Sequence, residues 1–160
     1  MKIKDVIAED FVNYKLPSMF IITSKCNWKC CVEQGLDISI CQNQSIAKQK
    51  TLDISNKMLY NMFTSNPITE AIVLGGLEPF DQFEELIDFV AYFRKNNCNN
   101  TIVIYTGYYP NELIQEIKQL KNYSNIIIKF GRYIPKRPKR YDDVLGIELV
   151  SDNQYAEKIS

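Results

Sequence analysis

The sequence contains no histidine. Without an imidazole, the chain has no Ser-His-Asp triad, no histidine-ligated zinc and no histidine general base. A net charge is also missing, because 19 Lys and Arg residues balance 19 Asp and Glu residues. This balance removes the bulk electrostatic attraction that binders of nucleic acid and membrane surfaces use. We therefore predict no nucleic-acid partner and no membrane partner, and any ligand must be recognised locally.

Long hydrophobic runs are absent as well. No stretch approaches the roughly 20 apolar residues of a membrane span, and Met1–Asp5 leads into no apolar signal-peptide core. We expect a cytoplasmic protein. The 160 residues, 46% hydrophobic and 24% charged, have the composition of a globular chain and the length of one domain. The prediction is a single domain over residues 1–160.

Apolar, β-prone runs alternate with helix-like or polar stretches, which is the pattern of a parallel α/β sheet. The expected strands are Met19–Thr23, Ala71–Leu74, Ile102–Thr106, Ile126–Phe130 and Ile147–Val150. Helical spacing of apolar residues predicts helices over Asn56–Phe63, Phe83–Lys95 and Asn111–Lys121. The segment between Cys31 and Thr51 has no clear periodicity, so we expect a long loop there, and loops of that length are usually functional.

Four of the five cysteines are clustered: Cys26, Cys30, Cys31 and Cys41. The first follows the strand expected over Met19–Thr23, at the edge where α/β folds build active sites. In a reducing compartment, such a group binds metal or acts in catalysis more often than it forms disulfides. The fifth, Cys98, lies in the polar run Asn96–Asn100, and we expect it to be incidental.

The number of usable thiolates distinguishes the candidate metals. Cys30 and Cys31 are adjacent, and their side chains would diverge in an extended loop, so one of them joins Cys26 and Cys41 as a ligand. Three thiolates on a four-iron cluster leave one iron open for a substrate or cofactor, whereas three on zinc leave an open site with no base nearby. An iron–sulfur site is favoured, with a structural metal or unliganded buried thiols as alternatives.

These residues resemble the radical S-adenosylmethionine (SAM) enzymes, and among them the activating enzymes of anaerobic ribonucleotide reductases. That family carries a CxxxCxxC motif after its first strand, and Cys26 and Cys30 match the first spacing. Glu33 stands at the third position of the motif. Cys41 is similar to the third ligand instead, because Ile40 precedes it and Gln42-Asn43 follows it as in the family. The resemblance implies eight extra residues within a cluster-binding loop at about 24–50.

Later segments resemble the same branch, in the family's order. They are Gly75-Gly76-Leu77-Glu78-Pro79, similar to a GGEP loop with Leu77 added; Tyr105-Thr106-Gly107-Tyr108, similar to YTGY; Phe130-Gly131-Arg132-Tyr133, similar to DGRF with Phe130 replacing the aspartate; and Ser151-Asp152-Asn153-Gln154, similar to an SxNQ ending. The resemblance thus covers nearly the whole chain. It implies a minimal radical SAM domain, a partial (β/α)6-type TIM barrel with its cluster at the C-terminal edge of the strands.

The resemblance also implies cofactors and site residues. A [4Fe-4S] cluster would be held by Cys26, Cys41 and Cys30, with Cys31 as the alternative to Cys30. SAM would contact the remaining candidates: Ile40 near the adenine, Gln42, the backbone of Gly75 and Gly76, Glu78 at the amino group, and Thr106.

The implied activity is reductive cleavage of SAM to make a glycyl radical on an anaerobic ribonucleotide reductase. The implied partners are the large reductase subunit and a small electron donor such as flavodoxin. Two alternatives are a radical SAM enzyme acting on another glycyl-radical enzyme or a small molecule, and a non-enzymatic metal-binding module. The second would keep a metal without responding to SAM.

Overall fold

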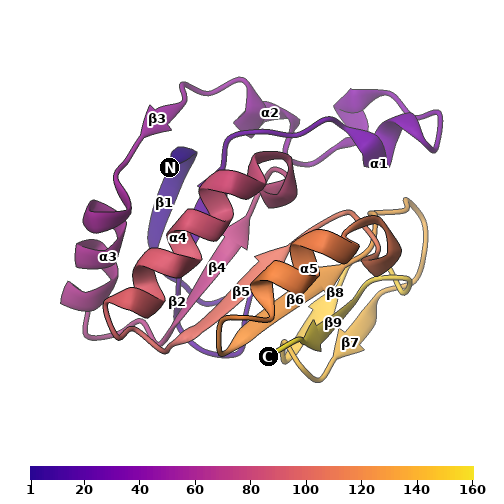
Figure 1. Ribbon diagram of the computed structural model, residues 1–160. Helices are drawn as coiled ribbons and strands as arrows, with labels where there is room; N and C mark the ends of the chain where they lie inside the picture. Colours follow the sequence, from indigo (N-terminus) through magenta and orange to yellow (C-terminus); the bar gives the residue numbers. More distant parts are fainter.

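A computed structural model describes all residues, 1–160, as a mixed α/β fold (Figure 1). One seven-stranded sheet has the order β3-β1-β2-β4-β5-β6-β9, and β7 and β8 form a separate two-stranded sheet. The strands are β1 Lys2–Asp10, β2 Ser18–Thr23, β3 Leu52–Asp53, β4 Ala71–Gly75, β5 Thr101–Tyr105, β6 Ile126–Phe130, β7 Arg140–Asp142, β8 Ile147–Leu149 and β9 Tyr155–Lys158. Strands β2, β4, β5 and β6 are parallel, whereas β1, β3 and β9 pair antiparallel.

Helices α3 Asn56–Ser65, α4 Phe83–Lys95 and α5 Ile114–Leu120 cover one face of this sheet (Figure 1). The side chains of Phe89 and Phe93 on α4 pack with alternate strand residues such as Ile102 and Ile104 in a core of 20 buried residues. Because burial of each large apolar side chain contributes roughly 1.5–3 kcal/mol, this face supplies most of the apolar stabilisation.

The opposite face carries a smaller core of eight buried residues. Val73 and Val103 of the sheet pack there against Tyr14, Leu145 and Leu149. The connection between β1 and β2 and the β7–β8 hairpin therefore cover the face that the helices leave free. A two-sided core is what continuous apolar runs such as that of β4 require.

Short helical turns lie at the end of the sheet to which the parallel strands point. They are α1 Lys29–Val32, η1 Ile38–Ile40, α2 Gln44–Ala47, η2 Pro79–Gln82 and η3 Pro110–Glu112. The residues between Cys31 and Thr51 thus include short helical turns, where we expected a loop without them. Likewise, α5 begins at Ile114 and not at Asn111, because Pro110–Glu112 forms a 3-10 turn.

The strands expected from continuous apolar runs are confirmed as β2, β4, β5 and β6. The strand expected over Ile147–Val150 forms as β8, but it pairs with β7 and stays outside the main sheet. The partial barrel stays a prediction, since four parallel strands form the centre of a sheet with antiparallel edges. None of the helices is both long and apolar enough to span a bilayer.

Candidate functional site

A cavity of about 410 Å³ lies where the cysteine loop, the carboxyl ends of β4, β5 and β6, and the β8 segment meet. Nine of the predicted site residues line it together: Cys26, Cys30, Cys31, Ile40, Cys41, Gln42, Gly76, Glu78 and Thr106. Gly75 is not among the lining residues. Its carbonyl accepts a hydrogen bond from the Thr23 hydroxyl at 3.1 Å, inside the sheet.

The four clustered thiols differ in exposure but share this cavity. Cys31 is buried at 5% exposure, whereas Cys26, Cys30 and Cys41 are partly exposed. No three Cys, Asp or Glu side chains come close enough to hold a single metal ion, so the thiols surround a volume without converging on one point. Cys98 lies away from the cavity, in the larger core, and its incidental role stays a prediction.

The adjacent pair belongs to one helical turn, α1, which follows Trp28 in a left-handed conformation with φ of 61°. Our prediction assumed an extended loop, but successive side chains diverge in a helix too, by about 100° per residue. The Cys30 thiol lies against the end of β5: a Cβ added at Gly107 would stand 2.6 Å from Sγ of Cys30. Glycine at position 107 therefore makes room for this thiol.

Burial makes these thiols weak acids before a metal is bound. It raises the pKa of Cys26 to about 12, and the carboxyls of Glu78 and Asp81 add to the effect. The pKa of Cys30 is also raised, mainly by burial and then by Glu78, while the charges of Arg132 and Lys129 lower it. Since iron binds thiolates, loading this site must release protons.

Glu78 is a buried carboxyl at the mouth of β4, 7% exposed. Its Oε1 accepts hydrogen bonds from the Thr106 hydroxyl at 2.8 Å and the Phe80 N–H at 3.2 Å, and its Oε2 accepts one from the Gly107 N–H at 2.9 Å. Burial raises the pKa of Glu78 to about 7, although these hydrogen bonds lower it. Glu78 makes no ion pair, so its charge is free for a cationic group in the cavity.

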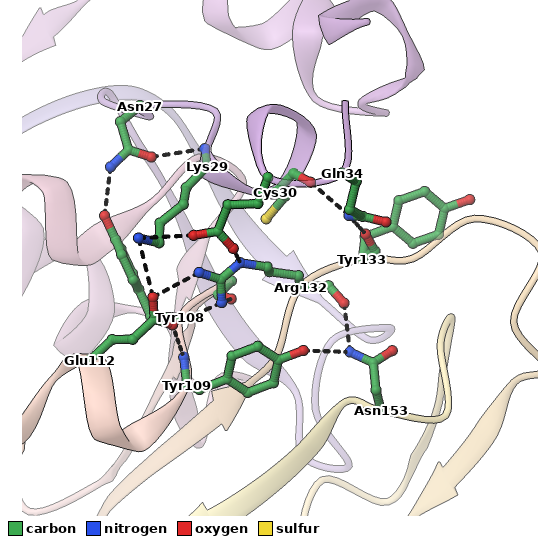
Figure 2. Close-up of polar contacts among 12 residues, drawn as sticks. Asn27, Lys29, Cys30, Gln34, Tyr108, Tyr109, Glu112, Arg132, Tyr133 and Asn153 are labelled. Carbon is green, nitrogen blue, oxygen red and sulfur yellow. Dashed lines mark hydrogen bonds and ion pairs between the residues drawn. The ribbon is translucent and has the colours of Figure 1, made fainter. Parts of the chain in front are cut away.

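An ion-pair cluster joins α1 of the cysteine loop to η3 and to the segment that follows β6 (Figure 2). Arg132 binds Glu112 with both terminal nitrogens, at 2.7 and 2.8 Å, and its Nε lies 2.6 Å from Oε2 of Glu33. Lys29 bridges the same two carboxylates at 3.0 and 3.2 Å. The Arg132 hydrogen bond is the main cause that lowers the pKa of Glu112 to about 2. We call Lys29, Glu33, Glu112 and Arg132 the Arg132 clamp.

Amide side chains extend this attachment on both sides (Figure 2). The side-chain amide of Gln34 donates to the carbonyl of Cys30 at 2.6 Å and to that of Tyr133 at 2.9 Å. Asn27 donates to the Tyr108 hydroxyl at 2.6 Å. On the opposite side, Asn43 donates to the Gly76 carbonyl, which ties the loop beyond Cys41 to the glycine turn.

Sequence reasoning missed Lys29, Glu112 and Arg132 as parts of the site. The pairs that join Glu112 to Lys29 and Arg132 to Glu33 are distant in the sequence, although Lys29 and Glu33 are only four positions apart. It also missed Lys129, although a charged residue inside the apolar run Ile126–Phe130 is a visible signal. Lys129 lines the cavity with the cysteines.

Comparison with known families agrees with this chemistry. Residues 18–153 match the model of the 4Fe-4S single cluster domain family. The chain belongs to this family. The match runs from β2 to the turn before β9, so this 4Fe-4S single cluster domain includes the cysteine loop and all the strand ends around the cavity. No curated protein matches the chain.

The cavity of this 4Fe-4S single cluster domain fits a cluster. Thiolates are the ligands of iron–sulfur clusters, and four thiols line the same cavity. A four-iron cluster is larger than a single ion, so its ligands stand further apart, as the thiols do here. The predicted iron–sulfur protein is therefore confirmed at the level of the family, and the choice of ligands stays a prediction.

Proposed function

We propose that this chain is a radical SAM activase that generates a glycyl radical on an anaerobic ribonucleotide reductase. The observation that carries the proposal is the placement of Glu78 in the same cavity as the four clustered thiols. A buried carboxylate without an ion-pair partner suits the positively charged amino group of SAM, and an iron left open by three protein thiolates suits its chelating atoms.

Cys26, Cys30 and Cys41 would hold the cluster in this proposal. Cys30 is preferred to Cys31 because its thiol lies against Gly107, just beyond the end of β5. Glu78 lies close to the same glycine: a Cβ added at Gly107 would be 3.6 Å from its Oε2. Cys31 remains the alternative second ligand. The Arg132 clamp and Gln34 would keep this part of the loop in place while the cluster is loaded.

SAM would lie between the glycine turn and the end of β5. Glu78, together with the backbone of Gly76, would hold the amino group, and Thr106 fixes the Glu78 carboxyl through its hydroxyl. The carbonyl of Gly75 is already bonded inside the sheet, so Gly75 is left out of this proposed contact. Ile40, 43% exposed on the cavity wall, would pack near the adenine, and Gln42 follows it on the same wall. When bound and reduced, the cluster would supply the electron needed to cleave the SAM sulfonium to methionine and a 5'-deoxyadenosyl radical. Such a radical would take a hydrogen atom, so the chain would need no general base.

The partner would be the large reductase subunit, whose glycine Cα–H donates that hydrogen atom. Exposed apolar residues among those that line the cavity, Val12 at 73% and Val150 at 43%, give a peptide loop an apolar surface on entry. A small electron donor such as flavodoxin would reduce the cluster. Neither partner requires a nucleic-acid or membrane surface.

The test is anaerobic reconstitution with iron and sulfide, followed by electron paramagnetic resonance (EPR) of the reduced protein with and without SAM. We expect a four-iron signal whose shape changes when SAM is added. A control with methionine in place of SAM should leave the signal unchanged. A four-iron signal that SAM does not alter would contradict the proposal.

A second candidate function is favoured by the buried Cys31 thiol. If all four clustered cysteines bind the cluster, no iron stays open, and the chain is a metal-binding module without SAM chemistry. In that case Cys30→Ala and Cys31→Ala would each reduce the iron content, and SAM would not change the EPR signal of the unmodified chain.

A further inference from the structure

Lys129 occupies an unusual position for a lysine. All five residues of β6 are buried, and Lys129 is 7% exposed. Lysine is almost never fully buried unless it is paired. Yet Lys129 makes no ion pair with any carboxylate of the chain. Burial of an unpaired charge costs folding free energy, so the groups around Lys129 should indicate its role.

The protein uses only part of the hydrogen-bonding capacity of Lys129. Its Nζ donates to the Gly131 carbonyl at 3.1 Å and lies 5.7 Å from the centre of the Tyr105 ring. An ammonium has three N–H donors, so donors remain for a group in the cavity. Lys129 is the only lysine or arginine among the residues that line this cavity.

The other charges in the cavity are negative or become negative. Glu78 lines it, and the cysteines bind iron as thiolates. Thiolate ligands outweigh the positive charge of a four-iron core, and reduction adds one more electron. Burial lowers the pKa of Lys129 to about 8, while Cys30 and Glu78 raise it, so the ammonium is mainly charged at neutral pH.

We propose that Lys129 is the counter-charge of the cluster site and that its ammonium stabilises the reduced, more negative cluster, which raises the reduction potential. The electron comes from an external one-electron reductant and goes to the cluster, and no covalent bond changes. Lys129 thus acts on the cluster through its positive charge and is not an iron ligand. This inference rests on the cluster placement in the proposed function, but it does not depend on SAM.

The experiment compares the unmodified protein with Lys129→Met, which removes the charge, and Lys129→Arg, which keeps it. Lys95→Met, on the exposed end of α4, is the matched control for loss of a lysine charge elsewhere. Each protein is reconstituted anaerobically, its iron and sulfide are measured, and its cluster is titrated with dithionite under EPR in the absence of SAM. Circular dichroism checks that each variant is folded.

For Lys129→Met we expect the ratio of reduced to oxidised cluster at a fixed potential to fall about tenfold, which is about 59 mV for a one-electron couple. Lys129→Arg and Lys95→Met should titrate like the unmodified protein. If Lys129→Met loads no cluster and Lys129→Arg does, the result supports a need for the positive charge at position 129 already during cluster assembly.

Three results would overturn the inference. Lys129→Met could titrate like the unmodified protein; Lys129→Arg could shift as far as Lys129→Met; or neither variant could load a cluster although both are folded. The last two would mean that the site needs the shape of lysine and not its charge. Failure of the unmodified protein to load any cluster is distinguishable, because it would contradict the cluster placement itself.

Discussion

At the scale of single residues, the thiols that line the cavity are not equivalent. Cys26 precedes α1 and Cys41 follows η1, so these two thiols lie on separate segments of the loop. Cys30 and Cys31 share one turn of helix, so either could move toward the cluster if the other were lost. Cys98 is packed among apolar side chains of the larger core.

We therefore expect Cys26→Ala and Cys41→Ala each to abolish cluster binding. Cys30→Ala should cost more iron than Cys31→Ala, because Cys30 lies beside Gly107 and Glu78. Iron and sulfide content after anaerobic reconstitution, with the visible absorbance of the cluster, measures these effects. Cys98→Ala is the control and should keep full iron content. Full iron in Cys41→Ala would show that the third ligand is not Cys41.

Glu78 should make the metal-free protein less stable as the pH rises. Its pKa in the fold, about 7, is above the ordinary 4.5, so the folded chain holds a proton that the unfolded chain loses in this window. The contribution of Glu78 to stability is therefore fully present below pH 4.5 and is lost as the pH rises to about 7. Relative to Glu78→Gln, the unmodified protein should lose about 3 kcal/mol of unfolding free energy across that window.

Urea denaturation of the metal-free proteins at several pH values measures this loss. Glu112→Gln is the matched control because the pKa of Glu112 is shifted the other way, to about 2. Its difference from the unmodified protein should stay flat over the same window and shrink only at lower pH. A difference between unmodified protein and Glu78→Gln that does not vary with pH would contradict the burial of a charged carboxyl.

At the scale of elements, the parallel strands could be predicted and their edges could not. Both faces of β4 and β6 are buried, so β4 is a run of apolar residues and β6 is apolar except at Lys129. β1 is a partly exposed strand, and its charged residues hide the β pattern. β8 was expected as a further strand of the sheet but joins a hairpin, because its partner is the nearby β7. Local patterns therefore predicted burial better than pairing.

The same limit applies to the site. The loop that carries Cys26, Cys30 and Cys41 could be located from its cysteines, and the strand ends that carry Glu78 and Thr106 follow from the parallel arrangement. The Arg132 clamp depends on α1, η3 and the end of β6 meeting in space, and Arg132 and Glu33 are 99 positions apart in the sequence. No local pattern encodes such a contact.

Because the Arg132 clamp joins these elements, its loss should loosen the cysteine loop before it unfolds the sheet. Arg132→Met leaves Glu112 without its main partner and Glu33 with Lys29 alone. Since both carboxylates are partly exposed, we expect a loss of about 1–3 kcal/mol. Hydrogen exchange over residues 26–43 should accelerate while that of β4 and β5 stays slow. Urea denaturation gives the free energy.

Arg137→Met is the matched control for this prediction. Arg137 pairs with Asp152 at 3.3 Å on the surface, where both side chains are 40% exposed or more, so its removal should change little. Exchange that accelerates equally in the loop and in β4 would show that Arg132 supports the whole fold and not the cysteine loop in particular.

At the scale of the whole molecule, the fold and the cluster site are separable. The two cores of 20 and eight buried residues include no side chain of Cys26, Cys30, Cys31 or Cys41. The loop instead reaches the sheet through polar contacts, such as those of Gln34 and Asn43. Small zinc domains differ, because their metal site replaces the core and they unfold without the metal.

Removal of the cluster with a chelator should therefore leave a folded protein with a loosened loop. We expect hydrogen exchange over residues 24–50 to accelerate strongly, while β4, β5 and β6 keep their protection. A core that folds without the ligand keeps its stability, so ligand binding stabilises only the segments that contact the ligand. Cys26→Ala, prepared without a cluster, should show the same pattern and should not change when the chelator is added. Cooperative unfolding of the sheet on chelation would mean that the cluster completes the core, and the proposed separation of fold and site would be wrong.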